Sequence, residues 1–115
     1  MAAEPHILDR LHDLIRQRLE ERPENSYVAR LAEGGLPSMG AKVCEEAGEL
    51  VEAAGGSDPG HTVHEAADLL FHAWVLLAAS GIEPSAVWAE LEGRFGTSGL
   101  VEKASRGAGR GDGGC

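Results

Sequence analysis

A long apolar segment between residues 66 and 79, interrupted by Asp68 and His72, restricts the fold of this chain more than any other feature. It is shorter than the roughly 20 residues that a membrane-spanning helix requires. Its second half is apolar on nearly every side of a helix, which is typical of a helix that other helices bury. We therefore expect residues 61–80 to form the central helix of a helical bundle, with no membrane partner.

The remaining apolar residues recur at helical spacing, and no stretch alternates with a period of two, so the pattern predicts helices and no strands. We expect further helices at residues 6–21, from 25 or 26 to about 31, and from 37 or 38 to about 54. A fifth helix begins at Pro84, a residue favoured in a first helical turn, and carries Val87, Leu91 and Phe95. The predicted fold class is all-α, a bundle of about five helices.

A single domain is expected over residues 1–106. Residues 107–115 are rich in glycine and hold no large apolar side chain, so we expect a disordered tail there. A chain of 115 residues buries only a modest core, yet both the central and the fifth helix are apolar. We therefore expect a homodimer in which two copies of the hairpin at 37–80 form a four-helix core. The alternative is a competent monomer whose first and fifth helices wrap that hairpin.

The net charge of the chain, -9 from ten basic and nineteen acidic residues, argues against binding to nucleic acid. Proteins that bind nucleic acid usually carry a basic stripe that replaces the counterions on the phosphates, and the sequence has none. The first residues lack a basic patch followed by an apolar run, so we expect no secretory signal. The predicted location is cytoplasmic.

Acidic residues gather on one side of the predicted helix at 37–54. Glu45, Glu46, Glu49 and Glu52 lie with Lys42 opposite the apolar side, and Glu46 falls next to it. Like charges three and four residues apart on a helix repel each other. Such a face is either exposed to solvent, which is the commoner case for a single helix, or neutralised by a cation.

The central helix carries Glu65, Asp68 and His72 within an arc of roughly 60°. A buried carboxylate is too costly to keep unless it is paired, protonated or bound to a metal. The alternative to a metal is pairing with Lys42, an arginine or a histidine. His72 is expected to orient one of the carboxylates from outside the ligand set. No role is assigned to His6, His12, His61 and His64.

A helical hairpin can bring Glu46 and Glu49 on one helix opposite Glu65 and Asp68 on the next. Four oxygen ligands suit Mg²⁺ or Mn²⁺, whereas zinc would require cysteine or histidine ligands. A metal ion neutralises the carboxylates and leaves positions open for phosphate oxygens. An acidic protein can thereby bind an anionic substrate.

The pattern Glu-Glu-x-x-Glu at residues 45–49, followed by Glu-x-x-Asp at residues 65–68, resembles the MazG-like all-α nucleotide pyrophosphohydrolases. Four segments look like the phosphoribosyl-ATP pyrophosphohydrolases in particular: RPENSY at 22–27, GAKV at 40–43, EAADLLFH at 65–72 and RFGTSGLVEKASR at 94–106. The resemblance covers residues 7–106. The chain departs from the family pattern at Cys44, where glycine is common, and at Phe71, where tyrosine is common. Neither departure removes a carboxylate.

This resemblance implies hydrolysis of 1-(5-phosphoribosyl)-ATP between its α and β phosphates, in the second step of L-histidine biosynthesis. Glu45 is the candidate for positioning or deprotonating the attacking water, and Glu49 can exchange with it in that role. The implied substrate contacts are Arg22, Ser26, Tyr27, Lys42, Arg94, Ser98, Gly99, Lys103 and Arg106. Ser26 and Tyr27 can instead cap and pack the second helix, and residues 96–99 can instead form a helix C-cap.

Two other functions share parts of this pattern. A house-cleaning MazG-like nucleoside triphosphate pyrophosphatase would use the same metal with a different base pocket. A non-catalytic helical metal-binding or dimerisation module, such as a ferritin-like carboxylate bundle, is the rival from another class. Di-iron bundles place Glu-x-x-His on two helices, and this spacing does not occur in the sequence.

Overall fold

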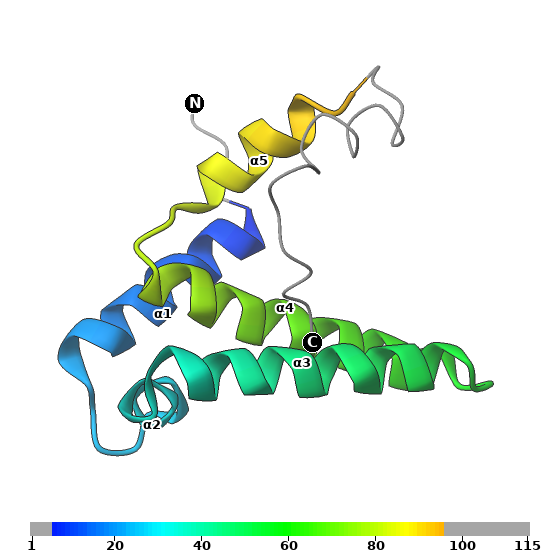
Figure 1. The fold of residues 1–115 in the computed structure, drawn as a ribbon, viewed down its shortest axis with the longest axis horizontal. Coiled ribbons are helices and arrows are strands. Elements are labelled where there is room, and N and C mark those ends of the chain that lie inside the picture. The colour runs from blue at the N-terminus through cyan, green and yellow to red at the C-terminus, as the bar shows by residue number, and fades with distance from the viewer. Residues whose placement is uncertain (1–5, 96–115) are drawn as a thin grey trace.

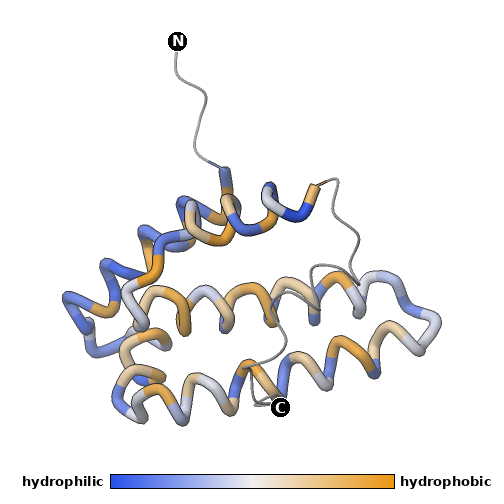
Figure 2. Tube along the Cα trace, turned by 45° about the horizontal axis from the view of Figure 1, so that its top comes forward, coloured by the Kyte–Doolittle hydropathy of each residue, from blue (hydrophilic) through white to orange (hydrophobic). Residues whose placement is uncertain are grey.

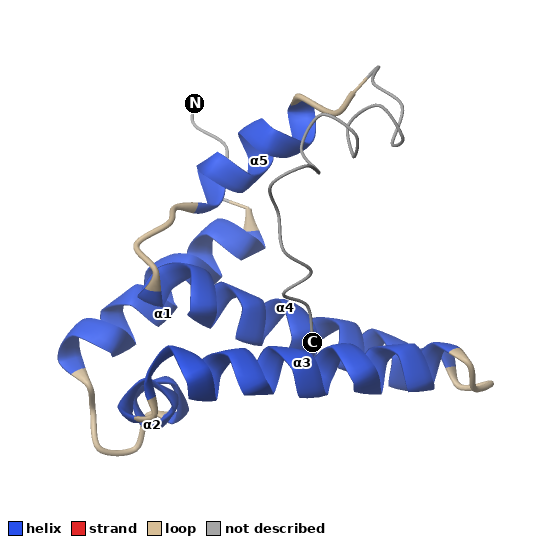
Figure 3. Ribbon diagram, viewed as in Figure 1, coloured by secondary structure: helices blue, strands red, loops and turns tan. Residues whose placement is uncertain are grey.

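The computed structural model describes residues 6–95, which are drawn in colour in Figure 1. These residues form five α-helices: α1 (Ile7–Glu21), α2 (Tyr27–Glu33), α3 (Gly35–Ala54), α4 (Pro59–Ala79) and α5 (Pro84–Glu92). No strand occurs within residues 6–95 (Figure 3), which confirms the all-α class. The tail predicted at residues 107–115 and the domain end predicted at residue 106 lie outside the described residues.

Several helix boundaries differ from the predicted ones, and the early starts of α3 and α4 each have a local reason. α3 begins earlier because Gly35, at φ 73°, lets the chain turn directly out of α2. α4 begins earlier because the Asp58 carboxylate accepts a hydrogen bond from the Gly60 amide at 3.0 Å and caps the helix. α5 ends at Glu92, so Phe95, predicted on the apolar side of the fifth helix, lies beyond it and is 79% exposed.

α3 and α4 form an antiparallel hairpin and lie side by side (Figure 1). α1 packs against the second half of α4, and α2 contacts both α1 and α3. α5 contacts α1 and extends away from the hairpin (Figure 1). The hairpin therefore has one end packed into a core by α1 and α2.

The core lies where α1, α2 and the beginning of α3 meet the second half of α4. Its buried residues are Ile15, Val28, Leu31, Met39, Trp74, Val75 and Ala78. Figure 2 shows the hydrophobic residues that continue along α4 towards its end. The indole Nε1 of Trp74 donates to the Leu8 carbonyl oxygen at 2.9 Å, so the polar atom of this buried ring has a partner. The prediction that other helices bury the second half of α4 is confirmed.

The chain turns sharply between α4 and α5. Gly81 adopts φ 75°, which glycine reaches without strain, and the Ile82 amide donates back to the Leu77 carbonyl oxygen at 3.0 Å. His12 of α1 fixes this turn, since its buried Nε2 lies 2.9 Å from the Ile82 carbonyl oxygen. Among the described helices, none alone is long and apolar enough to cross a membrane; α4 and α5 qualify only as a pair, bent by 110°.

Several large apolar side chains of the hairpin and the α5 segment are exposed in the single chain: Val51, Val63, Leu70, Leu91 and Phe95. α5 contacts α1, and the ring of its Trp88 lies 5.8 Å from the ring of Trp74 on α4, so α1 and α5 both pack against the second half of α4. Val51 and Val63, on the two helices of the hairpin, are 74% and 69% exposed. These side chains are available to a second chain, and the homodimer remains a prediction.

Ile15→Ala should lower the free energy of unfolding by about 2–5 kcal/mol, because Ile15 is 1% exposed and its truncation leaves a cavity in the core. Leu14→Ala is the matched control on the same helix, and it should cost less than about 1 kcal/mol since Leu14 is 45% exposed. Urea unfolding of both variants measures the difference. Equal costs would contradict the position of the core.

Candidate metal and substrate site

The acidic residues of α3 divide between its buried and exposed sides. Glu46 is buried, since it lies next to the apolar side of the helix, while Glu45 and Glu49 are exposed. On α4, Glu65 is also buried and Asp68 is half-buried. Taking two carboxylates out of water is unfavourable unless a partner or a cation compensates.

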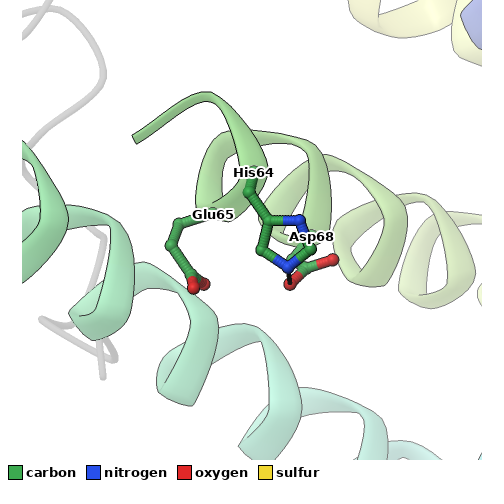
Figure 4. A group of neighbouring side chains, drawn as sticks. All are labelled: His64, Glu65 and Asp68. Atoms are coloured by element: carbon green, nitrogen blue, oxygen red, sulfur yellow. Dashed lines mark ion pairs between the residues drawn. The ribbon is translucent and has the colours of Figure 1, made fainter. Parts of the chain in front are cut away.

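The hairpin brings the predicted metal ligands together. Carboxylate oxygens of Glu46, Glu49 and Glu65 lie within 4.8 Å of one another. Donor atoms of His64, Glu65 and Asp68 form a second group within the same 4.8 Å limit (Figure 4). Glu65 belongs to both groups and so links Asp68 to the two glutamates of α3. All four carboxylates predicted as ligands therefore gather between α3 and α4, and we call them the carboxylate cluster.

His72 lies between α2 and the carboxylate cluster. Its Nδ1 is 2.8 Å from the Asp68 carbonyl oxygen, which can only accept, so in the neutral ring Nδ1 carries the proton and donates there. Its Nε2 then accepts from the Tyr27 hydroxyl at 2.8 Å. Nδ1 is also 3.8 Å from Oε1 of Glu46. The buried His72 thus contacts a predicted ligand from outside the ligand set, in the place that the sequence analysis expected.

Burial raises the pKa of Glu46 above its usual range. A hydrogen bond with Glu49 and the negative charges of Glu49 and Asp68 raise this pKa further, while His72 lowers it. Oε2 of Glu46 and Oε2 of Glu65 are buried without a hydrogen-bond partner within residues 6–95. Two such oxygens in one acidic cluster fit a divalent cation, which would pair with both and relieve the repulsion.

Lys42 and Tyr27 lie at the edge of the carboxylate cluster. Electrostatic interaction with Tyr27 is the main cause that raises the pKa of Lys42; interactions with Glu45 and Glu46 raise it further, and burial opposes the rise. The Lys42 ammonium donates to Oε1 of Glu45 at 3.4 Å. Tyr27 is about half exposed and its ring stacks on Phe71, with centroids 6.2 Å apart. The cluster therefore has a cation and an accessible aromatic ring beside it.

Ser26 and Arg22 make local contacts between α1 and α2. The Ser26 hydroxyl accepts from the Ala29 amide at 3.2 Å and caps α2, which is the alternative to a substrate contact that the sequence left open. Arg22 follows α1 in a left-handed conformation, φ 47°, and its Nε donates to the Leu19 carbonyl oxygen at 3.2 Å. Arg22 also lines a cavity of about 410 Å³ beside Met39, near the core and not among the clustered carboxylates.

Arg94 lies apart from the carboxylate cluster. Its Nη2 donates to Oε1 of Glu90 at 3.4 Å, and the side chain lines a cavity with Leu77 and Ile82. Leu77 follows Asp68 by more than two helical turns, about 13 Å along α4. Arg94 is therefore not among the side chains that this chain gathers at the carboxylates. The other predicted contacts lie outside the described residues: Ser98, Gly99, Lys103 and Arg106.

Two histidines without a predicted role pair with the carboxylates of α4. His61 Nε2 lies 3.3 Å from Oε1 of Glu65, and His64 Nε2 lies 3.3 Å from Oδ2 of Asp68. Each pair is four residues apart on one helix, the spacing at which side chains of successive turns meet. That spacing is the sequence signal by which His61 and His64 could have been found once Glu65 and Asp68 were assigned to a site.

Comparison with known proteins identifies a family. The family model described as phosphoribosyl-ATP pyrophosphohydrolase matches residues 8–95. This chain belongs to that family. A phosphoribosyl-ATP pyrophosphatase of Rhodopirellula baltica is 54% identical to it over 102 residues, covering 86% of this chain and 85% of the relative. A phosphoribosyl-ATP pyrophosphatase of Trichlorobacter lovleyi is 48% identical over 106 residues, covering 92% and 98% of the two chains.

A longer, bifunctional relative is also similar to this chain. The histidine biosynthesis bifunctional protein HisIE of Helicobacter hepaticus is 46% identical over 101 residues, which are 88% of this chain and 44% of that protein. The residues matched by the phosphoribosyl-ATP pyrophosphohydrolase model, 8–95, include all of the carboxylate cluster together with Lys42 and His72. The resemblance predicted from the motifs is thus confirmed over the stretch that holds the cluster.

Glu46→Gln should raise the melting temperature of the metal-free protein at neutral pH. Because the pKa of Glu46 is raised, the folded chain keeps this proton to a higher pH than the unfolded chain, and stability falls as the pH rises between the two pKa values. The gain should shrink towards about pH 4, near the pKa of an unfolded glutamate. Thermal unfolding in EDTA across this range measures it.

Glu52→Gln is the control for this measurement, because Glu52 is an exposed residue of the same helix. Its melting temperature should stay close to that of the unmodified chain at every pH. An equal gain in both variants would show that the burial of Glu46 is not the cause.

Proposed function

We propose that this chain is a phosphoribosyl-ATP pyrophosphatase that hydrolyses 1-(5-phosphoribosyl)-ATP to 1-(5-phosphoribosyl)-AMP and pyrophosphate, the second step of L-histidine biosynthesis. Membership of the family and the names of the relatives support the substrate and the pathway. One observation carries the chemistry: the carboxylate cluster holds two buried oxygens, on Glu46 and Glu65, without hydrogen-bond partners in residues 6–95. Such a cluster suits a cation that receives phosphate oxygens.

The proposed cofactor is Mg²⁺, with Mn²⁺ as the alternative, at Glu46, Glu49, Glu65 and Asp68. Hard cations of this kind prefer oxygen ligands. When bound, the ion supplies a Lewis acid that lowers the pKa of water and screens the charge of the triphosphate. The contribution of His72 is to brace the cluster, since it contacts Glu46 and the backbone of Asp68 at once.

Glu45 is the residue that we assign to the attacking water. Its side chain is 53% exposed, so water reaches it, and Lys42 holds it at 3.4 Å. Glu49 shares a group of donor atoms with Glu46 and Glu65, which favours the ligand role for Glu49. In this assignment Glu45 accepts the proton of the water, and Lys42 stabilises negative charge on the phosphates.

Apart from Arg22 and Ser26, which make local contacts between α1 and α2, the proposed substrate contacts fall into two sets. Lys42 and Tyr27 border the carboxylate cluster, so the same chain can supply them. Arg94 follows α5 and lies apart from the cluster of its own chain. A substrate at the cluster would therefore contact the Arg94 of a second chain more readily. The remaining proposed contacts follow Arg94 in the sequence: Ser98, Gly99, Lys103 and Arg106.

Pyrophosphate release from phosphoribosyl-ATP, ATP and dUTP, each with and without Mg²⁺, tests the proposed reaction. We expect release from phosphoribosyl-ATP, and only with the divalent ion, because the acidic cluster repels a triphosphate without it. Faster release from ATP or dUTP would favour the house-cleaning pyrophosphatase. Metal binding without release from any of the three would favour a non-catalytic metal-binding module.

Glu46→Gln and Asp68→Asn should each lower turnover by several orders of magnitude, because each removes a proposed oxygen ligand. Circular dichroism should show that the helices survive, since the substitutions also remove like-charge repulsion. Glu52→Gln is the matched control, because Glu52 is exposed on α3 and belongs to neither group of donor atoms. Near-normal turnover in both ligand variants would refute the ligand set, and a Glu52 variant as impaired as Glu46→Gln would show that the ligands were chosen wrongly.

We further propose that the enzyme is a homodimer paired through its hairpins. Val51, Val63 and Leu70 give α3 and α4 an exposed apolar surface, which a second hairpin would bury in a four-helix core. A two-fold pairing would also give each carboxylate cluster side chains that one chain does not bring there. The separation of Arg94 from the cluster within one chain supports this arrangement.

Light scattering across a dilution series, with activity measured in parallel, decides the oligomeric state. We expect a dimer that loses activity as it dissociates, because each carboxylate cluster then loses the side chains that the second chain supplies. Val63→Glu, at a position 69% exposed in the single chain, should promote dissociation without disturbing the core. A fully active monomer would refute the dimer.

A further inference from the structure

His64 adds a nitrogen donor to the acidic side chains of α4. Its Nε2 lies 3.3 Å from Oδ2 of Asp68, and donor atoms of His64, Glu65 and Asp68 all lie within 4.8 Å of one another. Figure 4 shows the three side chains pointing to the same side of α4. All three residues lie within positions 64–68 of α4, so the backbone of one helix sets their spacing. This group differs from the all-oxygen group of Glu46, Glu49 and Glu65.

A second observation points to a ligand at this group. Glu65 is 8% exposed, and its Oε2 has no hydrogen-bond partner within residues 6–95. His61 approaches the other oxygen, Oε1, at 3.3 Å. A buried carboxylate oxygen without a partner is unfavourable, and a cation is the partner that an acidic surrounding favours. Glu65 and Asp68 are also proposed ligands of Mg²⁺, so each would serve both neighbouring positions through its two carboxylate oxygens.

We propose that His64, Glu65 and Asp68 form a second metal position, which takes a borderline divalent ion of the Zn²⁺ and Co²⁺ class. Imidazole nitrogen suits these ions, whereas Mg²⁺ keeps to oxygen ligands. His64 is therefore the residue that sets the metal preference of this position. Three protein donors leave coordination positions open, and the side chain of His64 is 70% exposed, so water or phosphate oxygens can reach them. The proposal rests on the proposed function only in that Glu65 and Asp68 also belong to the proposed Mg²⁺ site.

A metal titration followed by ¹⁵N NMR of the histidine side chains tests the proposal directly. The full chain, labelled with ¹⁵N-histidine and free of metal, is titrated with Zn²⁺ and separately with Mg²⁺. We expect Zn²⁺ to shift the Nε2 resonance of His64 to saturation, because this atom becomes a ligand, and Mg²⁺ to leave it near its starting position. A resonance of His64 that does not respond to Zn²⁺ would overturn the proposal, whether or not Zn²⁺ binds elsewhere.

Calorimetry on two matched variants measures the contribution of His64 to affinity. Loss of an outer partner of a metal ligand commonly weakens binding by about 10–100-fold, so His64→Ala, which removes a ligand itself, should weaken Zn²⁺ binding at least that much. His6→Ala is the control: it removes an exposed histidine that caps α1 beside Trp88 and lies outside the group of three donors. It should change the Zn²⁺ affinity by less than about threefold. Equal losses in both variants would refute the assigned ligand set.

Neither measurement depends on turnover, so the outcome is separate from that of the proposed function. Zn²⁺ ligation by His64 in a chain that fails to hydrolyse phosphoribosyl-ATP would support the second metal position and reject the proposed reaction. Normal Mg²⁺-dependent hydrolysis, with no Zn²⁺ ligation by His64, would support the reaction and overturn the second metal position.

Discussion

The burial of two carboxylates, Glu46 and Glu65, between α3 and α4 is the arrangement on which the rest of the structure depends. Such burial is unfavourable without compensation, so it requires packing elsewhere to keep the hairpin closed. The second half of α4 supplies that packing, since Trp74 and Val75 lie in the core with α1 and α2. One helix thus serves both purposes: its first half carries two of the proposed ligands, and its second half anchors it.

The connection between the two halves runs through His72. This residue follows the ligands of α4 by one turn and precedes the core tryptophan, and it joins the Tyr27 hydroxyl of α2 to the surroundings of Glu46. Because both nitrogens of the ring have partners, its orientation is determined on two sides. The helix that packs the core is therefore also the helix that positions the carboxylates Glu65 and Asp68, and α2 contacts it through Tyr27 and His72.

The acidic composition and the anionic substrate class of the family are compatible for a physical reason. Negative charge is concentrated in the carboxylate cluster, where the proposed cation would neutralise it, and Lys42 lies at the edge of the same cluster. The histidines on α4 extend this pattern, since His61 and His64 lie beside the carboxylates and change the chemistry of the donors without adding negative charge. Family membership and the geometry of the cluster thus lead to the same class of reaction by separate routes.

Sequence alone determined the helices, the four clustered carboxylates and the family, because apolar spacing, helical period and motif order are properties of short stretches of chain. It could not decide how deeply Glu46 is buried, or whether Ser26 caps a helix, since those depend on neighbours that folding supplies. The contact of Tyr27 with His72 joins residues 45 positions apart, and the separation of Arg94 from the cluster follows from the packing of α5 on α1. Only the tertiary structure decided these points, because the angle at which helices pack is set by side chains from distant parts of the chain.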